Sequence, residues 1–287
     1  MGRIAYVNGR FSRHDQAVVH IEDRGYQLAD AVYEVWSLFD GKLADPEGHF
    51  ARLERSLGEL KIPMPMGRAA LTMVLKETVR QNRVREGLVY LQVGRGVAPR
   101  DHAFPHPDTP PSIVITVKAI DRVATEAKAA KGVSVITTPE NRWGRCDIKT
   151  VGLLPNAMAK QAAKERGAAE AWFVDEMGLV TEGASSNAWI IDAEGTVRTR
   201  ATNANILRGV TRYSLLDILK EQGMTVDERP FTPDEARAAK EAFITGAGAL
   251  VLPVVAVDGH PVGDGTVGPV AMKLRSLYIE RARATAI

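Results

Sequence analysis

The sequence predicts an α+β protein with two domains. Its 287 residues exceed what one compact core usually contains, which favours two units over one. Segments of alternating apolar residues are mixed with segments of helical spacing, without the regular strand–helix–strand repeat of a doubly wound sheet. A charged stretch rich in small residues lies between the two halves. We therefore expect a smaller N-terminal domain at 1–120, an interdomain connector at 121–131 and a larger C-terminal domain at 132–287, both domains containing sheets and helices.

Two turn signals organise the expected N-terminal domain. The pair Asn8-Gly9 lies between two short strand-like runs, and the pair Asp40-Gly41 does so further along the chain. Both pairs favour the tight turn of a β-hairpin. After the hairpins, the apolar spacing predicts helices at 46–62 and 67–82 and strands at 87–96 and 111–120.

The expected C-terminal domain shows the same mixture of elements. Pro155 and Gly167 fit the start and the end of one helix, and Gly178 and Gly195 mark turns between strands. The expected strands are at 132–139, 170–183, 187–199 and 241–262, and the expected helices are at 155–168, 211–224 and 268–284. This order completes the α+β prediction.

The composition excludes several classes of protein. A formal charge of +2 is too small to indicate nucleic acid or an anionic membrane as the main partner. Cys146 is the only cysteine, so no intrachain disulfide can form, which is typical of the reducing cytoplasm. The first residues, MGRIAYVNGR, lack the apolar core of a secretory signal, and no apolar run is long enough for a membrane span. We therefore expect a cytoplasmic protein.

Familiar catalytic and metal-binding signatures are absent. The sequence has no phosphate-binding P-loop, no H-E-x-x-H and no C-x-x-C, and TGAGAL lacks the third glycine of the dinucleotide fingerprint. His102 and His106 lie in a proline-broken loop and not on one helical face, so we expect no metal site there. A lone cysteine such as Cys146 is typically a small buried apolar residue.

One lysine changes this picture because of the segments that accompany it. Taken alone, Lys149 in RCDIKTVGLLPN is typical of a solvated surface residue. Its segment nevertheless resembles the lysine-bearing stretch of the fold-type IV pyridoxal 5′-phosphate (PLP) enzymes, which include D-amino acid aminotransferases, branched-chain aminotransferases and aminodeoxychorismate lyases. Six segments match in the same order along the chain: RGYQLADAVYEVWSL, HFARLERS, RWGRCDIKTVGLLPN, VTEGASSN, NILRGVTR and FITGAG. The resemblance implies the two-domain fold-type IV architecture.

The resemblance also implies roles for individual side chains toward PLP. Lys149 matches the catalytic lysine that forms a Schiff base with the cofactor, and Glu182 matches the carboxylate beside the pyridine nitrogen. That carboxylate keeps the nitrogen protonated, so that the ring can accept electrons. Arg52 matches an arginine that binds the cofactor phosphate, and Leu207 matches a residue that packs under the ring. Without the resemblance, Arg52 would be a polar-face helix residue and Glu182 a loop carboxylate.

Backbone amides complete the implied phosphate site. Val210 and Thr211 begin a predicted helix, whose first amides point toward an anion. Gly246 and Ala247 end a predicted strand, where a glycine turn exposes amides. The sequence departs from the family here, because D-amino acid aminotransferases carry hydroxyl residues in the stretch that ends at Gly248. The contacts of Gly246 and Ala247 with phosphate would therefore be through the backbone alone.

The stretch QVGRGVAPRDHAFP favours one branch of the family. Its Arg100-Asp101-His102 resembles the loop that binds the substrate carboxylate in D-amino acid aminotransferases, completed by a tyrosine that matches Tyr33. A guanidinium binds a carboxylate through two hydrogen bonds, and imidazole and phenol add further ones. The resemblance implies a homodimer in which Arg100 and His102 come from the partner subunit. Without the resemblance, this loop would be a basic, solvent-exposed segment.

The expected function is PLP-dependent transamination between a D-amino acid, such as D-alanine, and a 2-oxo acid, with 2-oxoglutarate or pyruvate as acceptor. Lys149 would move the proton from the substrate Cα, and the position of the carboxylate would decide which face of the substrate it meets. Three alternatives remain open. They are a branched-chain-type L-amino acid or (R)-amine transaminase, an aminodeoxychorismate lyase, and a PLP-binding dimer without catalytic activity.

Overall fold

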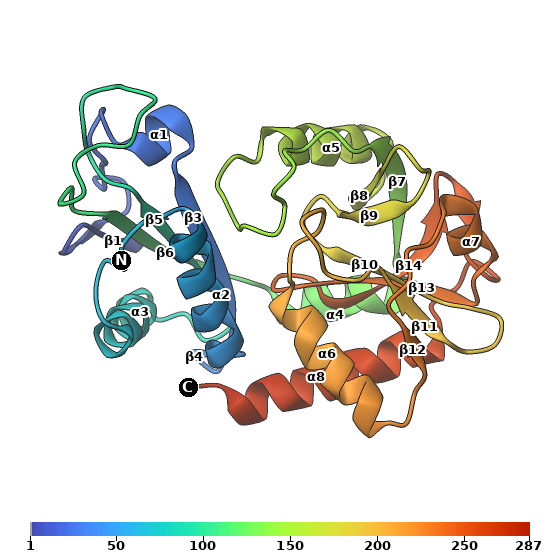
Figure 1. Ribbon diagram of the computed structural model, residues 1–287. Helices are drawn as coiled ribbons and strands as arrows, with labels where there is room; N and C mark the ends of the chain where they lie inside the picture. Colours follow the sequence, from blue (N-terminus) through green and yellow to red (C-terminus); the bar gives the residue numbers. More distant parts are fainter. Residues whose placement is uncertain (1) are drawn as a thin grey trace. The chain divides into compact units, whose positions relative to one another are not determined.

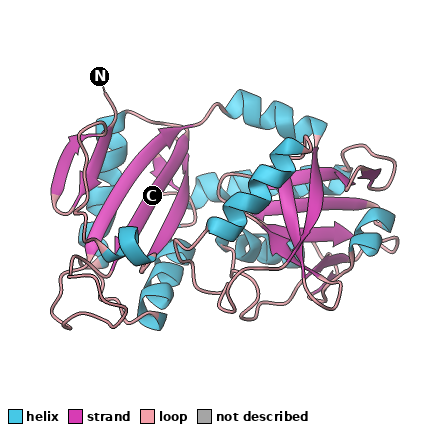
Figure 2. Cartoon of the chain, turned by 90° about the horizontal axis from the view of Figure 1, so that it is seen from above, coloured by secondary structure: helices cyan, strands magenta, loops and turns pink. Residues whose placement is uncertain are grey.

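The computed structural model describes residues 2–287, and Figures 1 and 2 show its helices and strands. The chain divides into two compact units. The first contains residues up to 121 together with Ile148–Gly152 and Thr285–Ile287, and the second contains Arg122–Asp147 and Leu153–Ala284. The expected C-terminal range 132–287 thus includes a short internal segment, with Lys149 in it, that lies in the first unit.

A six-stranded antiparallel sheet forms the first unit within the described residues, in the order β2-β1-β6-β5-β3-β4. The strands are β1 (Ile4–Val7), β2 (Arg10–Arg13), β3 (Ala31–Phe39), β4 (Lys42–Leu43), β5 (Gly87–Gly94) and β6 (Ser112–Ala119). The helices are α1 (Arg24–Leu28), α2 (Pro46–Glu59) and α3 (Arg68–Asn82). Apolar residues of α2 and α3 pack with those of β3 and β5 in one buried core, which includes Trp36, Leu53 and Leu75.

Both predicted hairpins of the first unit are confirmed. Asn8 and Gly9 adopt positive φ angles of 44° and 92° between β1 and β2. Asp40 and Gly41 adopt φ angles of 53° and 78° between β3 and β4. A two-residue turn with positive φ at both positions matches the right-handed twist of the flanking strands, which is why Asn-Gly and Asp-Gly favour it.

A nine-stranded mixed sheet forms the second unit within the described residues. Its order is β12-β11-β10-β13-β14-β7-β8-β9, with β15 paired to β14. The strands are β7 (Val133–Pro139), β8 (Glu170–Val174), β9 (Val180–Gly183), β10 (Asn187–Ile191), β11 (Val197–Thr199), β12 (Val226–Asp227), β13 (Glu241–Gly246), β14 (Leu250–Val257) and β15 (His260–Pro261). The helices are α4 (Arg122–Lys131), α5 (Leu154–Glu165), α6 (Val210–Glu221), α7 (Pro233–Ala238) and α8 (Pro269–Thr285).

The predicted α+β class is confirmed, with sheets and helices in both units. Three short helices were not predicted from the sequence. The residues expected to form the connector instead form α4, whose buried Ala129 packs in the core of the second unit. The other two, α1 and α7, are too short to show a clear apolar period. Among the helices of residues 2–287, none is both long and apolar enough to cross a membrane.

Candidate active site

Lys149 lies in the first unit because its segment runs along the strand β3. The amide of Tyr33 donates to the carbonyl of Lys149 at 3.0 Å, and the amide of Val151 donates to the carbonyl of Ala31 at 3.1 Å. Ile148 is buried in the core of this unit. The Lys149 side chain is therefore presented from an anchored backbone, and its Nζ lies 4.0 Å from the centre of the Tyr33 ring. The structure thus brings together two of the residues predicted to form the site.

Arg52 is bound by a buried carboxylate that the sequence analysis did not assign to the site. Glu34 follows Tyr33 on β3, and its two oxygens accept from Nε and Nη2 of Arg52 at 2.7 and 2.8 Å. His49, one turn earlier on α2, lies 2.8 Å from Oε2 of Glu34 through its Nδ1. Burial alone would raise the pKa of Glu34, but the charge and hydrogen bonds of Arg52 outweigh it and lower the pKa to about 2. Glu34 therefore fixes the orientation of Arg52.

The buried pair Glu34–His49 predicts a stability that falls in acid. The pKa of His49 is lowered from 6.5, mainly by burial, so its contribution is complete above that pH and declines below it. The pKa of Glu34 is lowered from 4.5 to about 2, so its contribution is lost as the pH falls through that interval. Between pH 7 and 5, His49→Gln should lose less stability than the wild type, by on the order of 1 kcal/mol. Urea unfolding midpoints at a series of pH values measure this.

The exposed His14 provides the control for that measurement. His14→Gln should keep the wild-type pH dependence, because a solvated imidazole titrates alike in folded and unfolded chains. If His49→Gln and the wild type lose stability in parallel from pH 7 to 5, His49 is not the group responsible.

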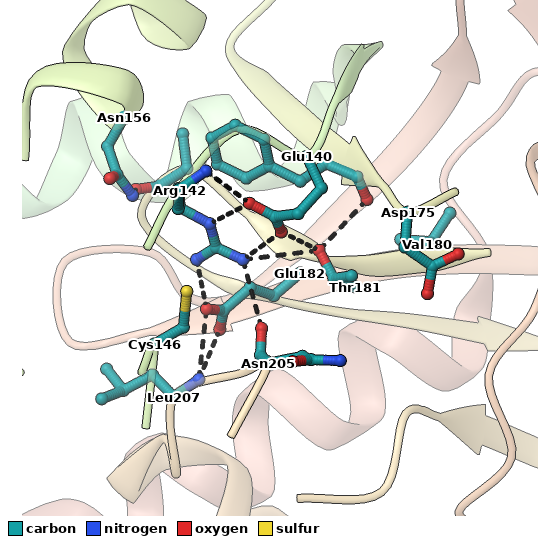
Figure 3. A network of polar contacts seen from close by, with 12 residues as sticks. Glu140, Arg142, Cys146, Asn156, Asp175, Val180, Thr181, Glu182, Asn205 and Leu207 are labelled. Carbon is teal, nitrogen blue, oxygen red and sulfur yellow. Dashed lines mark hydrogen bonds and ion pairs between the residues drawn. The ribbon is translucent and has the colours of Figure 1, made fainter. Parts of the chain in front are cut away.

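Glu182 is the centre of a polar network in the second unit (Figure 3). Its side chain is buried, and Oε1 lies 2.6 Å from Nη1 of Arg142. The backbone amide of Leu207 lies 3.1 Å from both carboxylate oxygens, and Nδ2 of Asn187 donates to Oε2 at 3.0 Å. Buried carboxylates persist when they are paired and hydrogen-bonded in this way. The network holds Glu182 in one orientation next to Leu207, so two further predicted residues lie together.

Arg142 is shared between two carboxylates, and this sharing explains its burial. Its Nη2 lies 2.6 Å from Glu140, on the side away from Glu182, and Thr181 donates to the same Glu140 oxygen at 2.8 Å. Burial alone would raise the pKa of Glu140, but the hydrogen bond and charge of Arg142 outweigh it and hold that pKa below its usual range. Arg142 and Asn187 both occur in the matched segments RWGRCDIK and VTEGASSN, but their contacts could not be inferred from the sequence.

The start of α6 offers backbone amides, as predicted for Val210 and Thr211. Its N-cap residue, Gly209, makes no side-chain cap hydrogen bond, so no side chain of the cap occupies the first amides. A Cβ at Gly209 would lie 2.0 Å from Oδ1 of Asn187, so only glycine fits there. Helix starts of this kind bind anions. Asn187 thus links Glu182 to the α6 start through its own side chain.

Gly246 and Ala247 lie at the end of β13 and in the turn after it. Both are half-buried, and a Cβ at Gly246 would lie 3.1 Å from the carbonyl of Ser185. This close approach allows only a small residue without some adjustment of the backbone. The two residues are placed in the same unit as the α6 start.

Arg100 and His102 are exposed in the long loop between β5 and β6 of the first unit. Tyr33 is half-buried on β3, where its ring stacks on Tyr90 with a centroid distance of 5.6 Å. Cys146 is different in character, since burial raises the pKa of its thiol to about 11 and its Sγ faces the carbonyl of Trp143. A thiol with a raised pKa is a poor nucleophile, in agreement with the sequence analysis.

Comparisons with known proteins place this set of residues in a family. Residues 31–257 match the model of amino-transferase class IV. The chain is 40% identical to a D-alanine aminotransferase of Bacillus licheniformis over 94% of this chain and 93% of that protein. It is 38% identical to a D-alanine aminotransferase of Staphylococcus haemolyticus over 96% of this chain and 97% of that one.

Solved structures agree with this placement. A branched-chain amino acid aminotransferase from a thermophile (T.th.), solved with pyridoxamine 5′-phosphate, is 27% identical, with a TM-score of 0.87 over 98% of this chain and 94% of that chain. The branched-chain amino acid aminotransferase of Escherichia coli is 21% identical and shares the fold, with a TM-score of 0.88 over 98% and 95% of the two chains. The protein therefore belongs to the class IV aminotransferase family.

Proposed function

We propose that the protein catalyses PLP-dependent transamination between a D-amino acid, such as D-alanine, and a 2-oxo acid, such as 2-oxoglutarate or pyruvate. The observation that carries the proposal is the buried Glu182, paired with Arg142 at 2.6 Å, in a chain whose anchored Lys149 presents an amine. Similarity to D-alanine aminotransferases over 94% of the chain supports the choice of substrate class. The structural core of the site is thus a fixed carboxylate and a fixed amine.

The residues present have the chemistry that PLP requires. When bound, PLP supplies an aldehyde that amines can attack and a pyridine ring that withdraws electrons from the substrate. We propose that Glu182 holds a proton on the ring nitrogen and that Leu207 packs against the ring. Lys149 would attach to the aldehyde and then move the proton at the substrate Cα.

The phosphate of PLP would bind to charges and amides of this chain. The first amides of α6, at Val210 and Thr211, lie at a helix start whose cap residue has no side chain to occupy them. We propose that Gly246 and Ala247 add backbone contacts and that Arg52 contributes its charge. Glu34 would hold Arg52 in one rotamer during this contact, since it binds two nitrogens of the guanidinium.

Substrate recognition is proposed for Tyr33, Arg100 and His102. The guanidinium of Arg100 and the imidazole of His102 are exposed and able to bind a carboxylate. We propose that they act in the partner subunit of a homodimer. Large apolar side chains in the same unit support a contact surface, because each is more than half exposed: Val18, Ile21, Tyr26 and Phe104.

A spectral titration tests the proposed function. Purified protein reconstituted with PLP should convert from the absorbance of lysine-bound cofactor to that of pyridoxamine phosphate when D-alanine is added. L-alanine should convert it far more slowly. Reduction with borohydride before the titration should leave a stable phosphopyridoxyl group on the peptide that contains Lys149. The absence of both the spectrum and the modified peptide would overturn the proposal.

A second candidate, L-selective branched-chain transamination, is favoured by the likeness to branched-chain aminotransferase structures. The two candidates differ in the hand of the amino donor. The initial rate with D-alanine and 2-oxoglutarate should exceed the rate with L-leucine and 2-oxoglutarate. The reverse order would assign the protein to the second candidate.

A further inference from the structure

Two buried arginines lie beside the loop that carries Arg100 and His102. Arg24 begins α1 and Arg95 follows β5, and their side chains are only 3% and 7% exposed. Both bind Asp30: Nε of Arg24 lies 2.8 Å, and Nε of Arg95 lies 2.7 Å, from the same Oδ2. Nη2 of Arg95 also lies 2.9 Å from Oδ1. Two guanidinium groups therefore share one carboxylate.

The register of the sheet brings this cluster together. In the β3–β5 pair, Ala31 lies opposite Gly94, so Asp30 and Arg95 are the next residues beyond the strand ends. The amide of Arg95 also donates to the carbonyl of Asp30 at 3.1 Å. Burial alone would raise the pKa of Asp30, but the hydrogen bonds from Arg95 and Arg24 outweigh it and lower the pKa. Asp30 is thus held in the charged form that binds both arginines.

The second arginine of the pair exceeds the charge of the carboxylate, and the remaining donors reach backbone carbonyls. Arg95 donates to the carbonyls of Leu60 at 2.8 Å and Lys61 at 3.2 Å, after the end of α2. Arg24 donates from Nη1 to the carbonyl of Asp101 at 2.7 Å. Buried cations require such partners, because an unpaired one is costly. The contacts of Arg24 and Arg95 therefore extend to two separate loops.

The contacts with the loop lie on both sides of His102. Asp101, which accepts from Arg24, stands between Arg100 and His102 in the sequence. The guanidinium carbon of Arg95 lies 3.6 Å from the centre of the Phe104 ring. Cation–π contacts of this kind are favourable even at partly exposed sites. An exposed segment is thus held at its backbone and at one ring by two buried cations.

We propose that Arg24 and Arg95 are positioning residues for recognition of the substrate carboxylate. They fix the backbone at Asp101 and the ring of Phe104, and thereby the directions in which Arg100 and His102 project. This inference rests on the proposed function, in which Arg100 and His102 bind that carboxylate. Ordering the loop before the substrate arrives lowers the entropy cost of binding, so loss of the anchors raises KM.

Arg24→Met in the PLP-loaded protein tests the proposal. Asp30 keeps both of its contacts with Arg95 in this variant, so no buried carboxylate is left unpaired. Loss of a charge-assisted hydrogen bond should raise KM for D-alanine and for the 2-oxo acid about tenfold. The kcat and the PLP content should stay close to wild type. Hydrogen exchange should become faster in residues 97–111, which a purely global loss of stability would not confine to that segment.

Two further single variants keep the test independent of folding. Phe104 is 59% exposed, so Phe104→Ala should fold normally, and it should raise KM in the same direction by a smaller factor. Arg80 is exposed and pairs with Glu77 on α3. Arg80→Met is the matched control and should leave KM and the hydrogen exchange of residues 97–111 unchanged.

A double-mutant cycle with Arg100→Met decides between the possible failures. If Arg24 acts through Arg100, then Arg24→Met should raise KM much less in the Arg100→Met background than in the wild type. Fully additive effects would overturn the positioning role. A normal KM in Arg24→Met and Phe104→Ala, with a raised KM in Arg100→Met, would overturn this inference alone. A normal KM in Arg100→Met would overturn the carboxylate role of Arg100 and the inference with it.

Discussion

Replacement of Lys149 by alanine should lower kcat for transamination of D-alanine with 2-oxoglutarate by at least about 10⁴-fold. Proton transfer by a positioned side chain alone contributes roughly 10²–10⁴-fold, and Lys149 is also the proposed site of covalent attachment of PLP. The alanine side chain can do neither. Pyruvate formation, coupled to lactate dehydrogenase and NADH oxidation, measures the rate.

Lys76 on α3 provides the matched control, because it is exposed and far along the chain from the proposed site residues. Lys76→Ala should retain the wild-type rate. Small primary amines in the buffer should restore part of the activity of Lys149→Ala, since they can occupy the space of the missing side chain and accept the proton. A Lys149→Ala variant within tenfold of the wild-type rate would exclude Lys149 as the catalytic amine.

Replacement of Glu182 by glutamine should lower kcat by about 10²–10³-fold, the range found when one electrostatic contact to the reacting system is removed. A neutral amide cannot hold a proton on the pyridine nitrogen as a carboxylate does. The fold should survive, because Arg142 keeps its ion pair with Glu140 at 2.6 Å. Steady-state kcat, together with the PLP content of the purified variant, measures the effect.

Glu140→Gln separates the two consequences of that change. It also removes a carboxylate from Arg142, but it leaves Glu182 and its contacts with Asn187 and Leu207 in place. We expect Glu140→Gln to lower the unfolding midpoint and to reduce kcat far less than Glu182→Gln does. Equal losses of kcat in both variants would show that Arg142, and not the carboxylate of Glu182, governs the rate.

Local signals in the sequence accounted for much of the fold. The turn pairs Asn8-Gly9 and Asp40-Gly41 determine positive φ angles within a few residues, so their hairpins follow from local steric preferences. Helices such as α2 and α3 follow from apolar spacing along a continuous segment. The helix α4 was missed because its small and charged residues bury only Ala129 and show little periodicity.

The candidate residues of the site were also accessible from the sequence, because their segments match the family in order. Their partners were not. Glu34 was part of a matched segment, yet its contact with Arg52 joins a strand to the following helix. Likewise, the network that joins Glu182 to Arg142 spans 40 residues of sequence.

The sequence by itself determined the hairpins, the α+β class, the family and the candidate amine and carboxylate, Lys149 and Glu182. These follow from local conformational preference and from residue types in a fixed order. Only the tertiary structure decided that the Lys149 segment runs along β3 and that Asp30 binds Arg95, 65 residues away. Such contacts depend on strand register, which the packing of the whole sheet sets and no local segment encodes.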